Sequence, residues 1–153
     1  RRLRYLAKSE LFRFLPLGLA IKALGAVPAN REDLQGSAGA VKFLIERLQA
    51  GEDILLFPEG QRSTDGRIQP LEQGVGLLAA RTGAPVIPAY IHGTFEAMPR
   101  GSRACRPVKI FLSFGEPLHP ASLGSKEVSA KDLRRAVTDL LEASLKELEA
   151  VNL

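Results

Sequence analysis

The stretch DILLFPEGQRSTDG, residues 53–66, changes from apolar to polar within a few positions. Residues 53–57 form an apolar run that is too short for a helix and is typical of a strand covered on both faces. The residues that follow include a Glu, an Arg, a Ser, a Thr and an Asp, more polar groups than a simple turn requires. The stretch therefore predicts a buried strand whose carboxyl end leads into either a polar turn or a site.

Helical patterns lie on both sides of this strand. Residues 36–50 repeat apolar side chains at helical spacing, and Gly51 follows as a helix stop. Residues 71–83 predict a second helix. Ser129 and Asp132 form a capping-box pattern, which predicts the start of a final amphipathic helix.

Further strands are predicted before and after the central one. Residues 26–30 are a short extended piece, and residues 84–91 form a second apolar run in which Pro88 marks an irregularity or an edge. Residues 107–115 alternate apolar and polar side chains, as a strand does. Helices that alternate with apolar strands predict an α/β fold with a mixed, mostly parallel sheet flanked by helices.

The composition is that of a globular domain. The chain has 153 residues, of which 45% are hydrophobic and 25% charged, and its net charge of +4 favours anionic partners. One cysteine excludes an intrachain disulfide, and no apolar run is long enough to span a bilayer. We expect a single domain over residues 1–153 that lacks part of its N-terminal end, since residue 1 is Arg.

Two arginines and a glutamate are the main candidates for binding an anion. Glu59 and Arg62 follow the central strand, at the edge where parallel sheets bind ligands. They form either a pocket, in which Arg62 binds a phosphate, or a strand-ending turn with a local Glu–Arg pair. Arg31 follows another short extended piece and either joins Arg62 at one anion or is a solvated surface residue.

Other reactive side chains are weaker candidates. His92 has the acidic residue Glu96 nearby but no clear partner for general-base catalysis, and His119 has the pattern of a loop residue. Cys105 has no identified histidine partner, so a role as a nucleophile is disfavoured.

The polar stretch resembles the third conserved block of the glycerolipid acyltransferases, the 1-acyl-glycerol-3-phosphate acyltransferase family. That block reads Phe-Pro-Glu-Gly, a variable residue, then Arg-Ser. Gln61 stands where Thr is commonest in the family. The matching residues are Phe57, Pro58, Glu59, Gly60, Arg62 and Ser63.

Two weaker resemblances lie in the order that this family requires. The stretch from Gly25 to Arg31 resembles the second block, although Ala29 and Asn30 replace the usual Val/Ile-Asp. The fourth block is matched by Val86, Ile87 and Pro88. The resemblance covers residues 3–120 and implies the α/β fold of these enzymes.

The family's first block, His followed after four residues by Asp, contains the catalytic base. It is not found here, because Ala97 lies five positions after His92 and Gly124 five after His119. In the family this block precedes the second one, so we expect it upstream of Arg1. No residue of the chain is therefore assigned as catalytic, and these residues alone are expected to be inactive.

The resemblance implies acyl transfer from an acyl thioester, acyl-CoA or acyl-carrier protein, to the free hydroxyl of lysophosphatidate or a related lyso-phospholipid, in phospholipid biosynthesis. Arg31 and Arg62 would bind the acceptor's phosphate, and Glu59 would either order the pocket or bind the glycerol hydroxyl. No cofactor is expected beyond the thioester co-substrate. Gly60 and Ser63 complete the substrate-binding set, with Phe57, Pro58 and Pro88 as pocket support.

The N-terminal stretch mixes basic and apolar residues, which suits a membrane surface. Residues 14–24 predict a short apolar helix interrupted early by Pro16, and an ordinary core helix is the alternative for this region. We expect the protein at the cytoplasmic face of a membrane, peripheral or anchored through other parts. The basic residues concerned are Arg1, Arg2, Arg4, Arg13 and Lys22.

Of two other function classes, a binding module is the alternative and a nucleic-acid binder is disfavoured. A non-catalytic lipid- or anion-binding module would keep the phosphate pocket without the base. A nucleic-acid binder is disfavoured, because aromatic residues make up only 6% and the basic residues are dispersed.

Overall fold

The computed structural model describes residues 3–29, 38–102, 104–123 and 128–151. The chain forms two compact units, Arg1–Phe57 and Pro58–Leu153, which are described separately. The prediction of an α/β fold with a mixed, mostly parallel sheet flanked by helices is confirmed by parallel pairing in the first unit and an antiparallel pair in the second. The prediction of one domain over residues 1–153 stays a prediction.

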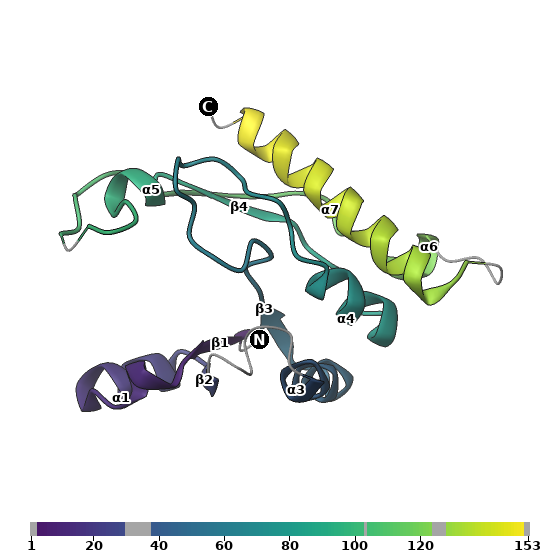
Figure 1. Ribbon diagram of the computed structural model, residues 1–153, viewed down its shortest axis with the longest axis horizontal. Coiled ribbons are helices and arrows are strands. Elements are labelled where there is room, and N and C mark those ends of the chain that lie inside the picture. The colour runs from purple at the N-terminus through teal and green to yellow at the C-terminus, as the bar shows by residue number, and fades with distance from the viewer. Residues whose placement is uncertain (1–2, 30–37, 103, 124–127, 152–153) are drawn as a thin grey trace. The chain divides into compact units, whose positions relative to one another are not determined.

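The first unit contains a three-stranded parallel sheet in the order β2–β1–β3 (Figure 1). Its strands are β1 (Leu3–Lys8), β2 (Ala26–Ala29) and β3 (Asp53–Leu55). Two corrections follow. The helix offered as an alternative for the N-terminal region is wrong for β1, because both other strands pair with that segment. Cover on both faces of residues 53–57 is also wrong, because Leu55 and Phe57 are exposed.

The helices of the first unit are η1 (Ser9–Phe12), α1 (Leu15–Ala23) and α3 (Ala38–Gln49). Pro16 lies in the first turn of α1, where its missing N–H costs nothing, so it begins the helix and does not interrupt it. Gly51 ends α3 as predicted, with a positive φ of 77°. Its N–H bonds the Leu48 carbonyl at 3.0 Å, as in a Schellman motif.

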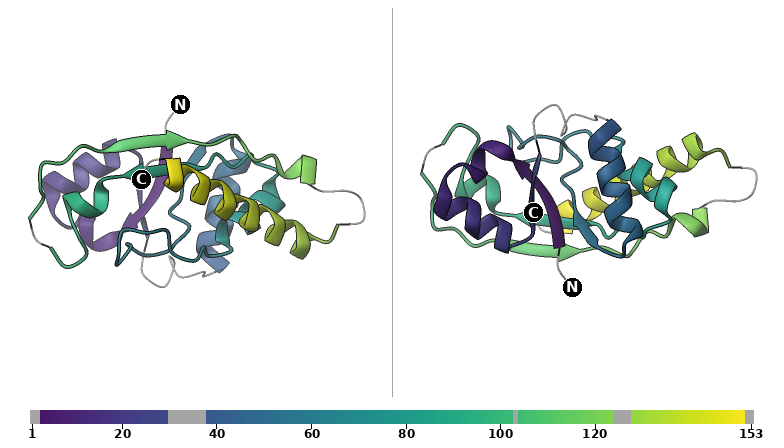
Figure 2. Two further views of the ribbon diagram at one scale, coloured as in Figure 1. Left: turned by 90° about the horizontal axis from the view of Figure 1, so that it is seen from above. Right: turned by 90° about the horizontal axis from the view of Figure 1, so that it is seen from below.

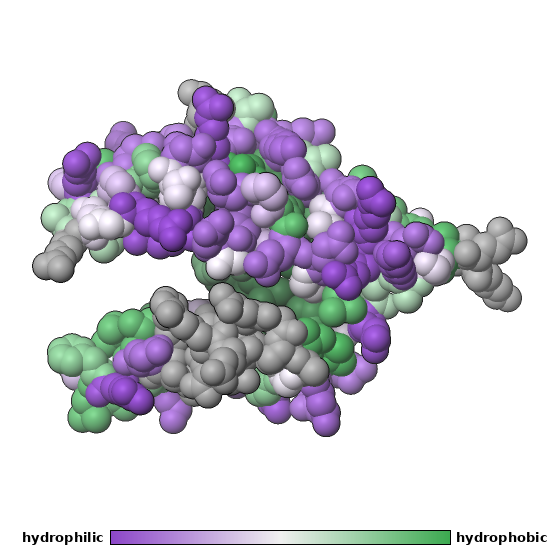
Figure 3. Space-filling model, in the orientation of Figure 1, coloured by the Kyte–Doolittle hydropathy of each residue, from purple (hydrophilic) through white to green (hydrophobic). Residues whose placement is uncertain are grey.

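The surface of α1 is unusually apolar. Phe14, Leu15 and Leu19 are 67%, 74% and 64% exposed, and Leu24 beyond the helix end is exposed as well. Figure 3 shows hydrophobic surface over α1, at the lower left of the view. Of the helices that the structure describes, none is long and apolar enough to cross a membrane.

The second unit combines an antiparallel strand pair with two long helices. Strands β4 (Ala89–His92) and β5 (Phe111–Phe114) pair, and both are shorter than the runs predicted at 84–91 and 107–115. Pro88 shortens the first run, because it has no N–H to donate and stands just before β4. The short helices are α5 (Thr94–Ala97) and α6 (Pro120–Leu123).

The core of the second unit lies where α7 (Ala130–Val151) packs on α4 (Gly74–Thr82). Helix α7 also runs along the β4–β5 pair (Figure 2). A Cβ at Gly76 would lie 2.2 Å from the Arg134 carbonyl oxygen, so only glycine permits this approach. Ser129 caps α7 as predicted, accepting the Asp132 N–H at 3.2 Å. The buried apolar residues are Leu78, Ala79, Val137, Leu141 and Leu145.

Candidate functional site

The conserved-block residues begin a closed loop that we call the 58–72 loop. Its ends meet where the Glu72 N–H donates to the Pro58 carbonyl at 2.7 Å. Gly60 and Gly66 adopt positive φ values of 66° and 82°, which disfavour residues with a Cβ. The backbone thus returns to its starting point within the second unit, and the polar side chains are carried on a defined turn.

Glu59 fastens the inside of this loop. Its Oε2 accepts the backbone N–H of Gln69 at 2.7 Å, and the side chain is half-buried. Among the described residues, Glu59 forms no ion pair with Arg62, so the local Glu–Arg pair considered from the sequence is wrong. The observed bond thus orders the loop that carries Glu59.

Arg62 is an exposed side chain that reaches out of the loop. Its Nη2 donates to the carbonyl oxygen of Met98, the residue that follows α5. A guanidinium has five N–H donors, and this bond uses one of them. The cationic fork of Arg62 is therefore held in place while it keeps donors and charge for an anion.

Ser63 and Asp65 shape the tip of the loop. The Ser63 Oγ accepts the Gly66 N–H at 2.9 Å and lies 2.8 Å from the Arg67 carbonyl oxygen, to which it donates. Asp65 Oδ1 accepts the Arg67 N–H at 3.0 Å. This backbone bond is the main cause that lowers the pKa of Asp65 below its usual 3.8. In this structure Ser63 supports the turn.

The remaining predicted residues have separate positions. Arg31 lies outside the described residues. Phe57 belongs to the first unit and is exposed, and Pro58 supplies the carbonyl that closes the loop. Pro88 is fully buried, and its carbonyl accepts the Gly115 N–H at 2.9 Å, so it supports the β4–β5 framework.

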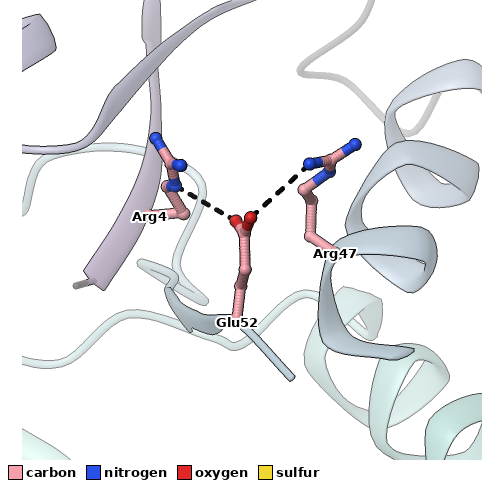
Figure 4. A network of polar contacts seen from close by, with 3 residues as sticks. All are labelled: Arg4, Arg47 and Glu52. Carbon is pink, nitrogen blue, oxygen red and sulfur yellow. Dashed lines mark hydrogen bonds and ion pairs between the residues drawn. The ribbon is translucent and has the colours of Figure 1, made fainter. Parts of the chain in front are cut away.

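Arg4 was expected to favour a membrane surface, but it is bound within the first unit. Figure 4 shows Glu52 between Arg4 and Arg47, with Arg4 Nε 3.0 Å from one carboxylate oxygen and Arg47 Nη1 3.5 Å from the other. These pairs join β1 to α3 and to the residue before β3. Arg13 and Lys22 remain exposed beside the apolar surface of α1.

His92 and Cys105, which the sequence disfavours as catalytic groups, are also described by the structure. His92 ends β4 with its ring centroid 6.3 Å from that of Phe111. Cys105 is exposed. Across the described ranges, no cluster of three or more His, Cys, Asp or Glu residues that could hold a metal is found.

Sequence reasoning missed two residues of this region. Glu149 of α7 accepts the Ile68 N–H at 3.1 Å through its Oε1, across 81 positions, a separation that no local pattern reveals. Tyr90 of β4 lies near several carboxylates. Burial raises its pKa above 10.0, and the charges of Glu149, Glu96 and Glu59 add to the effect.

Comparisons with known proteins agree on one family. A family model described as Acyltransferase matches residues 1–92. The chain is 33% identical over 147 residues, 96% of its length, to the 1-acyl-sn-glycerol-3-phosphate acyltransferase of Bacillus subtilis (strain 168), of which it covers 69%. It is 36% identical over 99 residues, 65% of its length, to the chloroplastic 1-acyl-sn-glycerol-3-phosphate acyltransferase BAT2 of Brassica napus.

A solved structure gives the same result. The crystal structure of the 1-acyl-sn-glycerophosphate (LPA) acyltransferase PlsC from Thermotoga maritima superposes with a TM-score of 0.73 at 31% identity, covering 96% of this chain. The chain spans 57% of that protein and 29% of BAT2. On the family match and on the identity along nearly its whole length, the chain belongs to the 1-acyl-glycerol-3-phosphate acyltransferase family of glycerolipid acyltransferases.

Proposed function

We propose that the protein containing this chain transfers an acyl group from acyl-CoA or acyl-carrier protein to the free hydroxyl of lysophosphatidate or a related lyso-phospholipid, in phospholipid biosynthesis. The observation that carries the proposal is Arg62 of the 58–72 loop, which one bond to the Met98 carbonyl holds at the surface with its charge available. Relatives whose printed names describe this activity, matched over most of the chain, support it.

In the proposed site, Arg62 binds the acceptor's phosphate. Arg31, which lies outside the described residues, keeps the phosphate-binding role that its motif implies. A guanidinium suits this task because its charge is permanent and its donors are forked to match phosphate oxygens. Glu59 orders the loop that carries Arg62, through its bond to Gln69. Gly60 lets the loop turn at a positive φ, and Ser63 braces its tip.

The proposed reaction is general-base catalysis without a covalent enzyme intermediate. A histidine removes the proton from the acceptor hydroxyl, whose oxygen attacks the thioester carbonyl. The carbon–sulfur bond then breaks, and the thiolate leaves and takes the proton from the imidazolium. Neither His92 nor His119 has an Asp five positions later. We therefore propose that this histidine lies outside the 153 residues, and that these residues alone are inactive.

We also propose that the protein works at the cytoplasmic face of a membrane, in contact with the apolar surface of α1. Lyso-phospholipids are amphiphilic, so an enzyme that uses them has to reach the interface where they lie. The exposed Phe14, Leu15 and Leu19 would enter the lipid, while Arg13 and Lys22 would meet anionic headgroups.

A donor–acceptor panel on the full-length protein tests the proposed function. Acyl-CoA and acyl-carrier protein would each be offered with lysophosphatidate, lysophosphatidylcholine and monoacylglycerol, and the acylated product identified by mass spectrometry. Transfer to a phosphate-bearing acceptor, with monoacylglycerol a poor substrate, is the expected result. Binding of lysophosphatidate without any product would instead support the non-catalytic module.

A further inference from the structure

Two neighbouring backbone N–H groups of the 58–72 loop are each held by a carboxylate. The Ile68 N–H donates to Glu149 at 3.1 Å, and the Gln69 N–H donates to Glu59 at 2.7 Å. Both bonds are partly buried, where an unpaired backbone donor would be costly. Residues 68 and 69 of the loop are thus held from two sides, by Glu59 of the same loop and by Glu149 of α7.

Helix α7 is a firm support for the bond between Glu149 and the Ile68 N–H. Val137, Leu141 and Leu145 are buried in the core, so the helix cannot slide without exposing apolar surface. In its C-terminal half, α7 lies close to Gly115, the residue after β5, because a Cβ there would be 2.7 Å from the Ser144 Oγ. Glu149 extends from the last turn of this fixed helix.

The position of Glu149 is unfavourable for helix stability alone. A negative side chain near a helix C-terminus opposes the helix dipole, which favours cations there. The bond to the Ile68 N–H gives this carboxylate a structural role in spite of its local cost to the helix. The family model ends at residue 92, so motif comparison does not assign a role to Glu149.

We propose that Glu149 is a positioning residue of the acceptor site: by holding the Ile68 N–H it fixes the 58–72 loop, and with it Arg62, in the geometry that binds the acceptor's phosphate. The inference rests on the proposed function for its substrate. Its structural part, the fastening of the loop to α7, stands on the observed bond alone.

The proposal predicts different behaviour for two variants of Glu149 and a control variant of Glu147. Glu149→Gln keeps an oxygen that can accept the Ile68 N–H, whereas Glu149→Ala removes it. Glu147→Ala is the matched control, because Glu147 is exposed, lies in the same last turn and removes the same charge from the helix end. Any effect of the helix dipole therefore appears in Glu147→Ala as well.

The experiment measures loop opening and acceptor kinetics together, in the full-length protein. Amide hydrogen exchange of Ile68 and Gln69 should quicken about 10- to 100-fold in Glu149→Ala, the effect expected for losing a hydrogen bond to a charged group, and remain near wild type in the other two variants. The KM for lysophosphatidate should rise by a similar factor in Glu149→Ala, with a smaller change in kcat. Thermal melting confirms that each variant is folded.

Each outcome decides one part of the proposal. Exchange in Glu149→Ala that equals exchange in Glu147→Ala overturns the fastening role. Faster exchange with an unchanged KM overturns the acceptor-positioning role, provided that Arg62→Ala raises the KM in the same assay. If Arg62→Ala also leaves the KM unchanged, the proposed phosphate site fails and the positioning role falls with it, while the exchange data still decide whether Glu149 fastens the loop.

Discussion

The carboxylate of Glu59 accepts the backbone N–H of Gln69 at 2.7 Å, and this bond crosses the base of the 58–72 loop. Glu59 therefore acts on the chain ten residues after it, while Arg62 lies between the two bonded positions. A residue that stands inside the conserved block thus has a task that is visible without any substrate: it sets the shape of the segment that carries the arginine.

The first prediction separates the two roles considered for Glu59. Glu59→Gln keeps an acceptor for the Gln69 N–H, so an ordering role predicts near wild-type exchange of that amide and a near wild-type acceptor KM. Glu59→Ala leaves the part-buried donor unpaired and should destabilise the closed loop by about 1–2 kcal/mol. Amide exchange and acceptor kinetics check both variants. A large kcat loss in Glu59→Gln, with exchange unchanged, would point to direct contact with the substrate.

The second prediction concerns the charge of Arg62. Arg62→Ala should raise the KM for lysophosphatidate about 10- to 100-fold, since hydrogen bonds to charged groups contribute about 1.5–3 kcal/mol. Activity toward monoacylglycerol, which has no phosphate, should change far less. Arg81→Ala is the control, because Arg81 is an exposed arginine of α4 in the same unit. Equal losses with both acceptors would contradict phosphate binding by Arg62.

The features that the sequence predicts well are those set by neighbours along the chain. The stop of α3 at Gly51 and the cap of α7 at Ser129 each depend on residues within one turn. Strand β1 was missed, because only its pairing with distant β2 and β3 makes that charged segment a strand. Glu149 was missed for the same reason, since its partner is 81 residues away.

The candidate site divides in the same way. The order of motif residues in one loop identifies Glu59 and Arg62 from the sequence, but not what they bond. The partner of Arg62 is a backbone carbonyl, that of Met98, and a carbonyl has no sequence signature. Ser63 was assigned to substrate from its motif position, and its actual bonds to the turn follow from loop geometry.

The third prediction tests the backbone of the loop. Gly60→Ala should destabilise the second unit by about 1–2 kcal/mol, because the positive φ of 66° is unfavourable for alanine. Gly74→Ala is a matched control with the opposite sign, since Gly74 begins α4 with no atom within 4 Å of the added Cβ and alanine favours helices. Chemical denaturation measures both. Equal effects of the two changes would contradict the strained turn.

The fourth prediction concerns the apolar surface of α1. Leu19→Gln removes a side chain that is 64% exposed and should weaken binding to vesicles that contain an anionic phospholipid about tenfold. Val151→Gln is the control, because Val151 is 84% exposed on α7 in the second unit. Vesicle sedimentation of the full-length protein gives the comparison. Similar losses from both changes would exclude α1 as the specific contact.

The fifth prediction follows from the raised pKa of Tyr90. Burial is the first cause, and the charges of Glu149, Glu96 and Glu59 add to it, so the folded protein favours the neutral phenol. The stabilisation is therefore fully present below about pH 10, the pKa of an unfolded tyrosine, and is lost as the pH rises through the higher folded value. Tyr90→Phe cannot ionise, so its free energy of unfolding should fall less steeply in alkali.

The cause can be checked on Tyr90 directly. An NMR titration of its ring carbon next to the hydroxyl should give a pKa above 10.0 in the wild-type protein. Glu96→Gln and Glu149→Gln should each lower that pKa, because each removes a nearby negative charge, and burial should keep it above 10.0. Glu147→Gln should not change it, since Glu147 is not among the causes of the shift. A wild-type value at or below 10.0 would contradict the placement of Tyr90 among these carboxylates.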